Sequence, residues 1–236
     1  MSRNAEACQC ERPVEKGVNK HMRQENEILS ESELQKAMNN RYSPEIFKKL
    51  DQAKVAVAGL GGLGSNVAFF LVRSGVKQLH LIDFDRVDYS NLNRQQYFLQ
   101  HVGMYKTEAI KKELESINPY LKITSDCVKV TEDNIKDLFE SEDIICEAFD
   151  VPEMKAMLVN GILEHFPDKK LVSASGMAGY GDSNEIRTRK VSRNFYLCGD
   201  GISAPECEGG LMAPRVAMCA AHEANMIIKL ILKPEL

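Results

Sequence analysis

The sequence predicts an α/β fold: a mostly parallel sheet with helices on both faces, extra strands toward the C-terminus and a C-terminal helix. Two observations predict it. Short apolar runs that are typical of buried strands alternate with helical segments along most of the 236 residues. The first of those runs ends in a glycine-rich turn, Gly59-Leu-Gly-Gly-Leu-Gly64, and a helix follows. Strands joined by helices pair in parallel, because a parallel neighbour needs a long crossover connection.

The expected elements follow one another from Lys54 onward. Strands are expected at 55–58, 78–83, 121–129, 143–149 and 169–175, with one more candidate at 186–197. Helices are expected at 65–74, 106–117, 131–140, 152–166 and 214–232. Residues 84–103 form a long polar connection, and the glycine-rich residues 176–214 are expected to be irregular and flexible.

The chain divides into three parts by composition. Residues 1–26 are polar and charged, which predicts a flexible tail. Residues 27–53 form a predicted helical segment interrupted by a proline, in which Ser30 followed by Glu33 resembles a capping box. Residues 54–236 contain the predicted sheet.

Composition and charge exclude several classes of protein. A net charge of −4 and the absence of tryptophan argue against a nucleic-acid binder. No apolar stretch is long enough for a membrane helix, and the charged N-terminal region does not resemble a signal peptide. The seven cysteines are an odd number and include no C-x-x-C pair, which favours reduced thiols in a cytoplasmic protein and argues against a zinc site.

The glycine turn has the Rossmann-like spacing of a nucleotide-binding turn. Its first glycine permits a tight turn, Gly61 lets the backbone approach a phosphate, and Gly64 lets helix and strand pack closely. The following helix presents free N–H groups and its positive dipole end to an anion. Asp83 follows by about 20 residues, where it can accept hydrogen bonds from a ribose. The turn is therefore expected to bind a nucleotide. By this pattern alone the expected nucleotide is NAD. The alternative is a tight turn that binds no ligand.

Residues beyond Asp83 favour ATP over NAD. Arg94 lies in a polar loop, Lys106 begins a helix and Asp150 ends a later strand. Ligands of such sheets bind outside the carboxyl ends of the strands, so these side chains should gather round bound phosphates. A guanidinium, an ammonium and a carboxylate able to hold Mg²⁺ suit a triphosphate. A dehydrogenase would also need a proton-transfer residue, and no histidine is expected in this group.

Together these residues resemble the ThiF/MoeB family, the bacterial relatives of ubiquitin-activating enzymes. The resemblance rests on Gly59-Leu-Gly-Gly-Leu-Gly-Ser65, Asp83-Phe-Asp85, Ser90-Asn-Leu-Asn-Arg94-Gln95, Lys106 and Asp150, and it extends over residues 54–232. The short clostridial-type ThiF subgroup is the most similar, because of Cys198-Gly-Asp-Gly and Gly210-Leu-Met-Ala-Pro-Arg215.

The resemblance implies that residues 54–236 form an ATP-binding adenylation domain. By matched position, Arg94, Lys106 and Asp150 would be catalytic, and Asp150 would hold Mg²⁺. Family members often have Asp-Asn where this chain has Asp150-Val151, so one nucleotide contact of the family is not expected here. ATP would be bound by Gly59, Gly61, Gly62, Gly64, Asp83, Asp85, Ser90, Asn91, Asn93, Arg94, Gln95 and Lys106, with Asp83 on the ribose.

The implied substrate is the C-terminal glycine carboxylate of a small ubiquitin-like sulfur carrier. A ThiS-like carrier ending in Gly-Gly would place the enzyme in synthesis of the thiamine thiazole, with a cysteine desulfurase as sulfur donor. The alternatives are the molybdopterin carrier, a carboxylate on modified tRNA, or a non-catalytic nucleotide-binding partner. Family members form homodimers in which an arginine acts in trans; Arg41 is the nearest candidate, and a solvated charge is the alternative.

The cysteines have separate expected roles. Many relatives hold zinc on two C-x-x-C pairs, and this chain has neither, so no zinc is expected. Cys198 and Cys207 lie where a carrier tail could reach them for sulfur transfer; an ordinary thiol is the alternative. The basic segment 187–193 would dock an acidic carrier or form a solvated strand edge. The thiols expected in the core are Cys127, Cys146 and Cys219.

The adenylation step needs no general base. A C-terminal carboxylate has a pKa of about 3.3–3.7 and is ionised at neutral pH. The site must instead align the reactants and neutralise phosphate charge, which is the role expected of Arg94, Lys106 and Mg²⁺ on Asp150.

Overall fold

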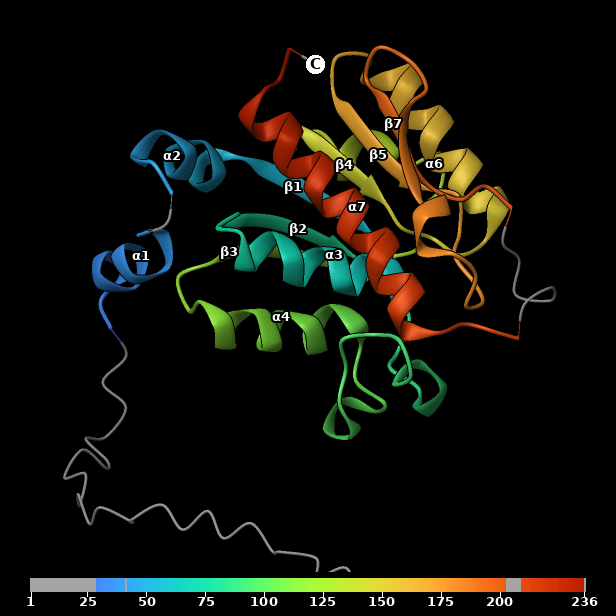
Figure 1. Cartoon of the computed structure of the whole chain (residues 1–236), viewed down its shortest axis with the longest axis horizontal. Coiled ribbons are helices and arrows are strands. Elements are labelled where there is room, and N and C mark those ends of the chain that lie inside the picture. The colour runs from blue at the N-terminus through green and yellow to red at the C-terminus, as the bar shows by residue number, and fades with distance from the viewer. Residues whose placement is uncertain (1–28, 41, 203–208, 236) are drawn as a thin grey trace, which may run out of the picture.

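The computed structural model of the chain describes residues 29–40, 42–202 and 209–235. A seven-stranded sheet has helices on both of its faces, which confirms the predicted α/β fold (Figure 1). The helices are α1 (Glu31–Asn39), α2 (Pro44–Gln52), α3 (Gly62–Arg73), α4 (Lys106–Ile117), α5 (Ile135–Leu138), α6 (Pro152–His165) and α7 (Ala213–Leu232). The strands are β1 (Lys54–Ala58), β2 (Gln78–Ile82), β3 (Lys122–Asp126), β4 (Ile144–Glu147), β5 (Lys170–Ala174), β6 (Arg187–Lys190) and β7 (Phe195–Gly199).

The strands lie in the order β3-β2-β1-β4-β5-β7-β6, and neighbours pair in parallel except for β6 and β7. The chain builds β2 and β3 on one side of β1, and then crosses over to build β4 and β5 on the other side. The strand order therefore reverses between β1 and β4. In open α/β sheets this is the point at which ligands bind, beyond the carboxyl ends of the strands.

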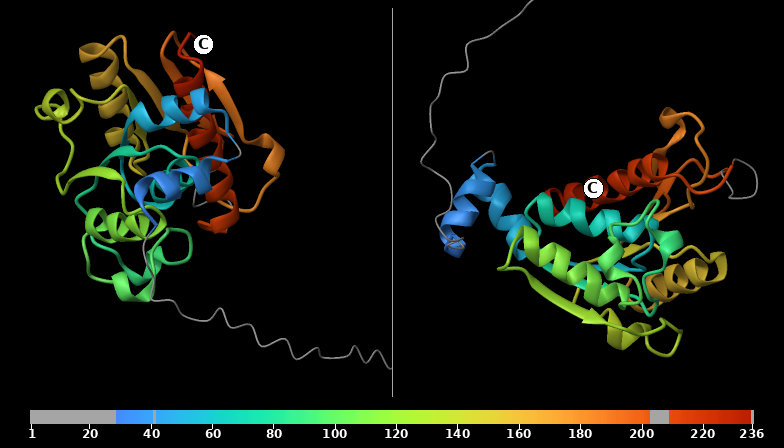
Figure 2. Two further views of the ribbon diagram at one scale, coloured as in Figure 1. Left: turned by 90° about the vertical axis from the view of Figure 1, so that its left-hand side faces the viewer. Right: turned by 90° about the horizontal axis from the view of Figure 1, so that it is seen from below.

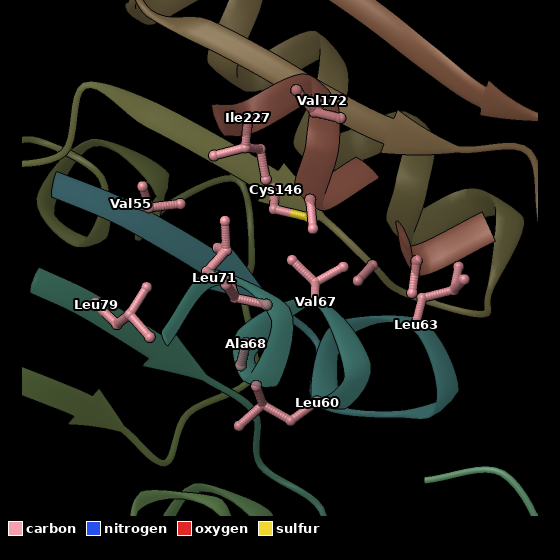
Figure 3. Packing of buried hydrophobic residues seen from close by; sticks show 14 of the residues in the cluster. Val55, Leu60, Leu63, Val67, Ala68, Leu71, Leu79, Cys146, Val172 and Ile227 are labelled. Carbon is pink, nitrogen blue, oxygen red and sulfur yellow. The ribbon is translucent and has the colours of Figure 1, made fainter. Parts of the chain in front are cut away.

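Alternate residues of β1 enter two separate cores, one on each face of the sheet. Val55 and Val57 belong to the core under α3, α4 and α7, in which Ile227 of α7 is also buried (Figure 3). Ala56 and Ala58 belong to the core under α5 and α6. On its own face α7 lies beside α3, as the view from below shows (Figure 2). Both faces of the strand before the glycine turn are therefore covered.

The N-terminal helical segment consists of two helices, because Pro44 begins a second one. The N–H of Ser30 donates to Oε2 of Glu33 at 3.0 Å, as the capping-box pattern predicts. The ammonium of Lys49 donates to the carbonyl of Leu232 at 2.8 Å, so α2 is joined to the end of α7.

Three predictions fall outside the described residues: the tail at 1–26, Arg41 and Cys207. Within the part of the chain that the structure describes, no helix combines the length and apolar character needed to span a membrane.

Two predicted helices have bounds that differ from the observed ones by more than one residue. The helix after the glycine turn begins at Gly62 rather than at residue 65, so the last glycines of the turn are already helical. Of the helix predicted at 131–140, only Ile135–Leu138 is helical. Asn134 accounts for the shortening, because its side chain accepts the N–H of Thr131 at 2.8 Å and holds the preceding residues in a turn.

The extra C-terminal strands are confirmed, and the strand candidate at 186–197 is an antiparallel hairpin of two strands, β6 and β7. The N–H of Val191 donates to the carbonyl of Phe195 at 2.8 Å across its turn. Cys198 consequently lies in β7 and is fully buried, not in an irregular segment. Cys127 is exposed rather than in the core, because β3 ends one residue before it. The thiols of Cys146 and Cys219 are buried as predicted.

Candidate functional site

The glycine turn joins β1 to α3 and closes against the end of β4. Gly59 has a φ of 91°, and a Cβ there would lie 2.8 Å from the carbonyl oxygen of Ala148. A Cβ at Gly64 would collide with the carbonyl oxygen of Gly59. Both obstructing atoms are main-chain atoms that cannot rotate away, so only glycine fits at these two positions.

The middle of the turn has more space. A Cβ at Gly61 would meet Nε2 of Gln95 at 3.8 Å, an ordinary contact, whereas a Cβ at Gly62 would lie 3.0 Å from Val216 of α7 and 3.6 Å from Arg94. Gly61 precedes the first turn of α3, whose N–H groups have no partners within the helix. Main-chain N–H groups and a helix dipole together favour a phosphate at this position.

Asp83 connects the glycine turn to the end of β2. Its buried carboxylate accepts the N–H of Leu60 at 2.6 Å and the N–H of Asp85 at 2.8 Å. Burial raises the pKa of Asp83, while the nearby Lys106 and the two N–H groups act to lower it. The hydroxyl of Tyr97 donates to the carbonyl of Leu60 at 2.8 Å, so both peptide groups of Leu60 are held in place.

Lys106 places its ammonium beside two acids at the start of α4. Its Nζ lies 2.8 Å from Oδ2 of Asp85 and 3.8 Å from Oδ2 of Asp83. Lys106 is buried, whereas the side chain of Asp85 is half exposed. A buried cation whose closest partner faces solvent can exchange that partner for a phosphate oxygen.

A short 3₁₀ helix, Tyr89–Asn91, shapes the loop that carries Arg94. The carboxylate of Asp88 accepts the N–H and the hydroxyl of Ser90 at 2.9 and 2.7 Å. The Nη1 of Arg94 then donates to the carbonyl of Ser90 at 3.1 Å and to Oδ1 of Asn93 at 2.9 Å. The guanidinium is therefore half-buried against its own loop, with other N–H groups left for a ligand.

This loop is fastened to the elements on either side of it. Asn66 of α3 donates to the carbonyl of Gly62 at 2.7 Å and to the carbonyl of Arg94 at 3.1 Å. Asn93 donates to the carbonyl of Leu211, just before α7, at 3.0 Å. The loop predicted to contact phosphates thus lies directly against the glycine turn.

Asp150 follows β4 and is exposed to solvent. Burial lowers the pKa of Arg94, and the negative charge of Asp150 opposes that shift, so the two side chains interact electrostatically. The structure therefore brings the predicted site residues together: Asp83 and Lys106 beyond β2, Asp150 beyond β4, and Arg94 against the glycine turn between them.

These residues fit ATP with its metal ion. The turn offers N–H groups, and the buried Oε1 of Gln95 beside Gly61 has no hydrogen-bond partner among the described residues, so it can accept from a ligand. An exposed carboxylate suits Mg²⁺, which binds one or two protein carboxylates together with substrate phosphates. Among residues 29–40, 42–202 and 209–235, no group of three or more metal-ligating side chains forms an all-protein site. The absence of zinc from the whole chain stays a prediction.

The structure adds charged residues to this site, two of which, Glu147 and Lys155, the sequence did not single out. Glu147 is fully buried and lies 2.9 Å from Lys155, and Asp200 lies 2.7 Å from the buried Arg215. A glutamate within the apolar run 144–148 was the available signal, because a buried carboxylate requires a partner. Asp200 and Arg215 stand in the two segments that carry the subgroup resemblance, but their pairing could not be predicted because it joins separate parts of the chain.

The environment of Cys198 argues against a sulfur-transfer role. Burial raises the pKa of this thiol to about 12. The Sγ of Cys198 lies 3.5 Å from Oγ1 of Thr188. A buried neutral thiol is not a nucleophile. The basic segment 187–193 contains β6, an exposed edge strand, which is compatible with both predicted alternatives.

Comparisons with known proteins agree on one family. The model of the ThiF family matches residues 34–236. The chain is 32% identical over 190 residues to the adenylyltransferase and sulfurtransferase UBA4 of Candida glabrata. That match covers 78% of this chain and 43% of the relative, so the chain spans less than half the length of this curated protein.

Two solved structures share the fold. E. coli tRNA N6-threonylcarbamoyladenosine dehydratase, TcdA, in complex with ATP superimposes with a TM-score of 0.76 at 21% identity, over 88% of this chain and 98% of that one. E. coli MccB with ATP superimposes with a TM-score of 0.59 at 27% identity, over 80% of this chain and 59% of that one.

Proposed function

The chain belongs to the ThiF family, and we propose that it is an ATP-dependent adenylyltransferase that activates the C-terminal glycine carboxylate of a small ubiquitin-like sulfur carrier. The observation that carries this proposal is the grouping of Arg94, Lys106 and the exposed Asp150 round the glycine turn. Two cations and an exposed carboxylate suit a triphosphate with its Mg²⁺. NAD, the default ligand of the glycine pattern, does not require this set of charges.

Each residue has a role that follows from charge and position. The carrier carboxylate attacks the α-phosphorus and expels pyrophosphate; it is already ionised, so the step needs no general base. The N–H groups at the start of α3 and the ammonium of Lys106 hold phosphate oxygens, and Arg94 stabilises charge that builds up in the transition state. Asp150 would hold Mg²⁺, which when bound supplies positive charge to the leaving pyrophosphate.

A ThiS-like carrier ending in Gly-Gly is the proposed acceptor, in thiamine thiazole synthesis with a cysteine desulfurase as sulfur donor. The name of the curated relative, adenylyltransferase and sulfurtransferase, supports a sulfur-carrier acceptor. The segments Cys198-Gly-Asp-Gly and Gly210-Leu-Met-Ala-Pro-Arg215 favour the short ThiF subgroup. A net charge of −4 argues against a tRNA acceptor.

A cytoplasmic homodimer in which Arg41 reaches the site of the partner subunit completes the proposal. The family resemblance supports it.

The test incubates the protein with ATP, Mg²⁺ and purified carriers ending in Gly-Gly. Mass spectrometry is expected to detect a carrier adenylate, and ATP–pyrophosphate exchange should depend on the carrier. Asp150→Ala is expected to abolish nearly all exchange, whereas Asp168→Ala, which alters another exposed aspartate remote from the turn, should not. Wild-type exchange in Asp150→Ala would refute the metal role, and exchange that requires tRNA instead of a carrier would refute the proposed acceptor.

A further inference from the structure

We propose that Lys155 is a positioning residue for Asp150, acting through the residues that end β4. This inference rests on the proposed role of Asp150 in holding Mg²⁺. Lys155 lies near the start of α6, and Asp150 lies in the short connection between β4 and α6. Figure 1 shows α6 packed along the same part of the sheet as β4 and β5.

Lys155 bonds to the chain on both sides of Ala148. Its Nζ lies 2.9 Å from Oε2 of Glu147 and 3.1 Å from Oε1, and it donates to the carbonyl of Phe149 at 2.8 Å. One ammonium therefore links the last residue of β4 to the residue immediately before Asp150.

Glu147 completes the arrangement from inside the sheet. It is 0% exposed, its Oε1 accepts the N–H of Phe149 at 2.7 Å, and its Oε2 accepts the hydroxyl of Ser173 from β5. We call Glu147, Lys155 and Ser173 the β4 brace. The brace binds both the N–H and the carbonyl of Phe149, so the peptide units on both sides of Phe149 are held, including the one that leads into Asp150.

The same segment is fixed relative to the phosphate cradle. The N–H of Ala148 donates to the carbonyl of Ala58 at 2.8 Å, and the carbonyl oxygen of Ala148 abuts Gly59. The brace thus sets where the carboxylate of Asp150 stands relative to the glycine turn.

Stability alone does not account for a buried ion pair at this position. Taking a carboxylate out of water is costly, and well-packed apolar residues are often as stabilising as a buried pair. Two hydrogen bonds of the β4 brace are made to the main chain of Phe149, next to Asp150. Partners that orient a metal ligand in this way typically change metal affinity or activity by about 10–100-fold when they are removed.

The test compares Lys155→Met, Lys155→Arg and a matched control, Lys169→Met. Lys169 is also a partly buried lysine whose ammonium donates to main-chain carbonyls, those of Phe139 and Glu140, but these lie away from Asp150. In ATP–pyrophosphate exchange, Lys155→Met is expected to lower kcat about 10–100-fold with little change in KM for ATP. Lys155→Arg should restore most of the loss, and Lys169→Met should leave kcat unchanged.

A second measurement does not depend on activity. Thermal unfolding is followed with ATP plus Mg²⁺ and with ATP plus EDTA. Wild type should gain extra stabilisation from Mg²⁺, and Lys155→Met should lose that increment while keeping the shift seen in EDTA. A retained increment in Lys155→Met, or an equal loss in Lys169→Met, would overturn the proposal. If the wild type shows the Mg²⁺ increment but none of the carriers supports pyrophosphate exchange, the proposed function fails and this inference stands.

Should Lys155→Met fail to fold, Ser173→Ala replaces it, because it removes only one hydroxyl donor from Glu147. A smaller loss of the Mg²⁺ increment is then expected. An increment equal to that of the wild type would again overturn the proposal.

Discussion

Lys106 and Asp85 form an ion pair in which the cation is buried and the anion faces solvent. The two charged atoms lie 2.8 Å apart, and the side chains are 8% and 51% exposed. Burial has already removed most water from the ammonium, and Asp83 supplies a second negative charge at 3.8 Å. A phosphate that enters from solvent would therefore compete with Asp85 for the ammonium of Lys106, which is already buried and positioned beside the two acids.

Replacement of this cation tests the phosphate role. Lys106→Met is expected to raise the Kd for ATP at least tenfold, because a hydrogen bond to a charged group contributes about 1.5–3 kcal/mol. Asp85→Asn removes the carboxylate that competes for Lys106 and should bind ATP as tightly as the wild type or more tightly; weaker binding would instead support the contact between Asp85 and ATP that the family resemblance implies. Isothermal titration calorimetry measures both constants. Lys106→Met binding ATP as tightly as the wild type would exclude this role.

Arg94 is expected to affect chemistry more than binding. Its Nη1 is bonded to Ser90 and Asn93, and its other N–H groups are expected to donate most strongly once charge builds up in the transition state. Arg94→Ala should therefore lower kcat for exchange about 10²–10³-fold, as expected for the loss of one transition-state donor, with a smaller change in the Kd for ATP. Arg86→Ala is the matched control, because Arg86 is an exposed arginine bonded to its own loop at Gly103. Equal losses in kcat and affinity for Arg94→Ala would contradict the assignment.

Substitutions at Gly59 and at Gly61 should separate the role of the glycine turn in stability from its role in ligand binding. Gly59→Ala forces an L residue into a φ of 91° and a Cβ to within 2.8 Å of a carbonyl oxygen, so it is expected to destabilise the protein by more than about 1 kcal/mol. Gly61→Ala meets only an ordinary contact and should keep the wild-type melting temperature while losing affinity for ATP. Circular dichroism and calorimetry check the two effects. A Gly59→Ala variant as stable as the wild type would show that the turn can accommodate a Cβ at this position, against the close contact with Ala148.

Residues whose place follows from chain order could be predicted from the sequence. The glycine turn, Asp83 and Asp150 each follow a strand, and the carboxyl ends of parallel strands meet at one edge of the sheet. Lys106 was predicted as the first residue of its helix, which the structure confirms. The predicted roles of these residues in binding and catalysis stay predictions.

Contacts between separate segments could not be predicted. The burial of Cys198 depends on a hairpin turn at 191–194 that carries no proline or glycine. Lys155 was assigned only to a helix, because its partner Glu147 lies across the connection in the preceding strand. These relationships arise from packing, which local periodicity does not encode.

Glu223 of α7 should make stability depend on pH. The side chain is fully buried, it accepts the thiol of Cys146 at 3.7 Å, and its Oε2 has no partner among the described residues. Burial raises its pKa from 4.5 to about 8; Lys155 opposes this shift, and the charge of Glu147 adds to it. The folded state therefore binds this proton more tightly than the unfolded state does. The corresponding stability is complete below pH 4.5 and is lost as the pH rises toward 8, by at most about 1.4 kcal/mol per pH unit.

Glu223→Gln removes this titration and keeps the shape of the side chain. Chemical denaturation of wild type and variant between pH 5 and pH 8 is expected to show a free energy of unfolding that falls more steeply for the wild type. The facing thiols of Cys146, Cys198 and Cys219 have raised pKa values and stay neutral in this range, and His80 titrates in both proteins, so both effects cancel in the difference. Parallel pH profiles for the two proteins would mean that Glu223 is ionised in the folded state, paired with Lys155 beside the β4 brace.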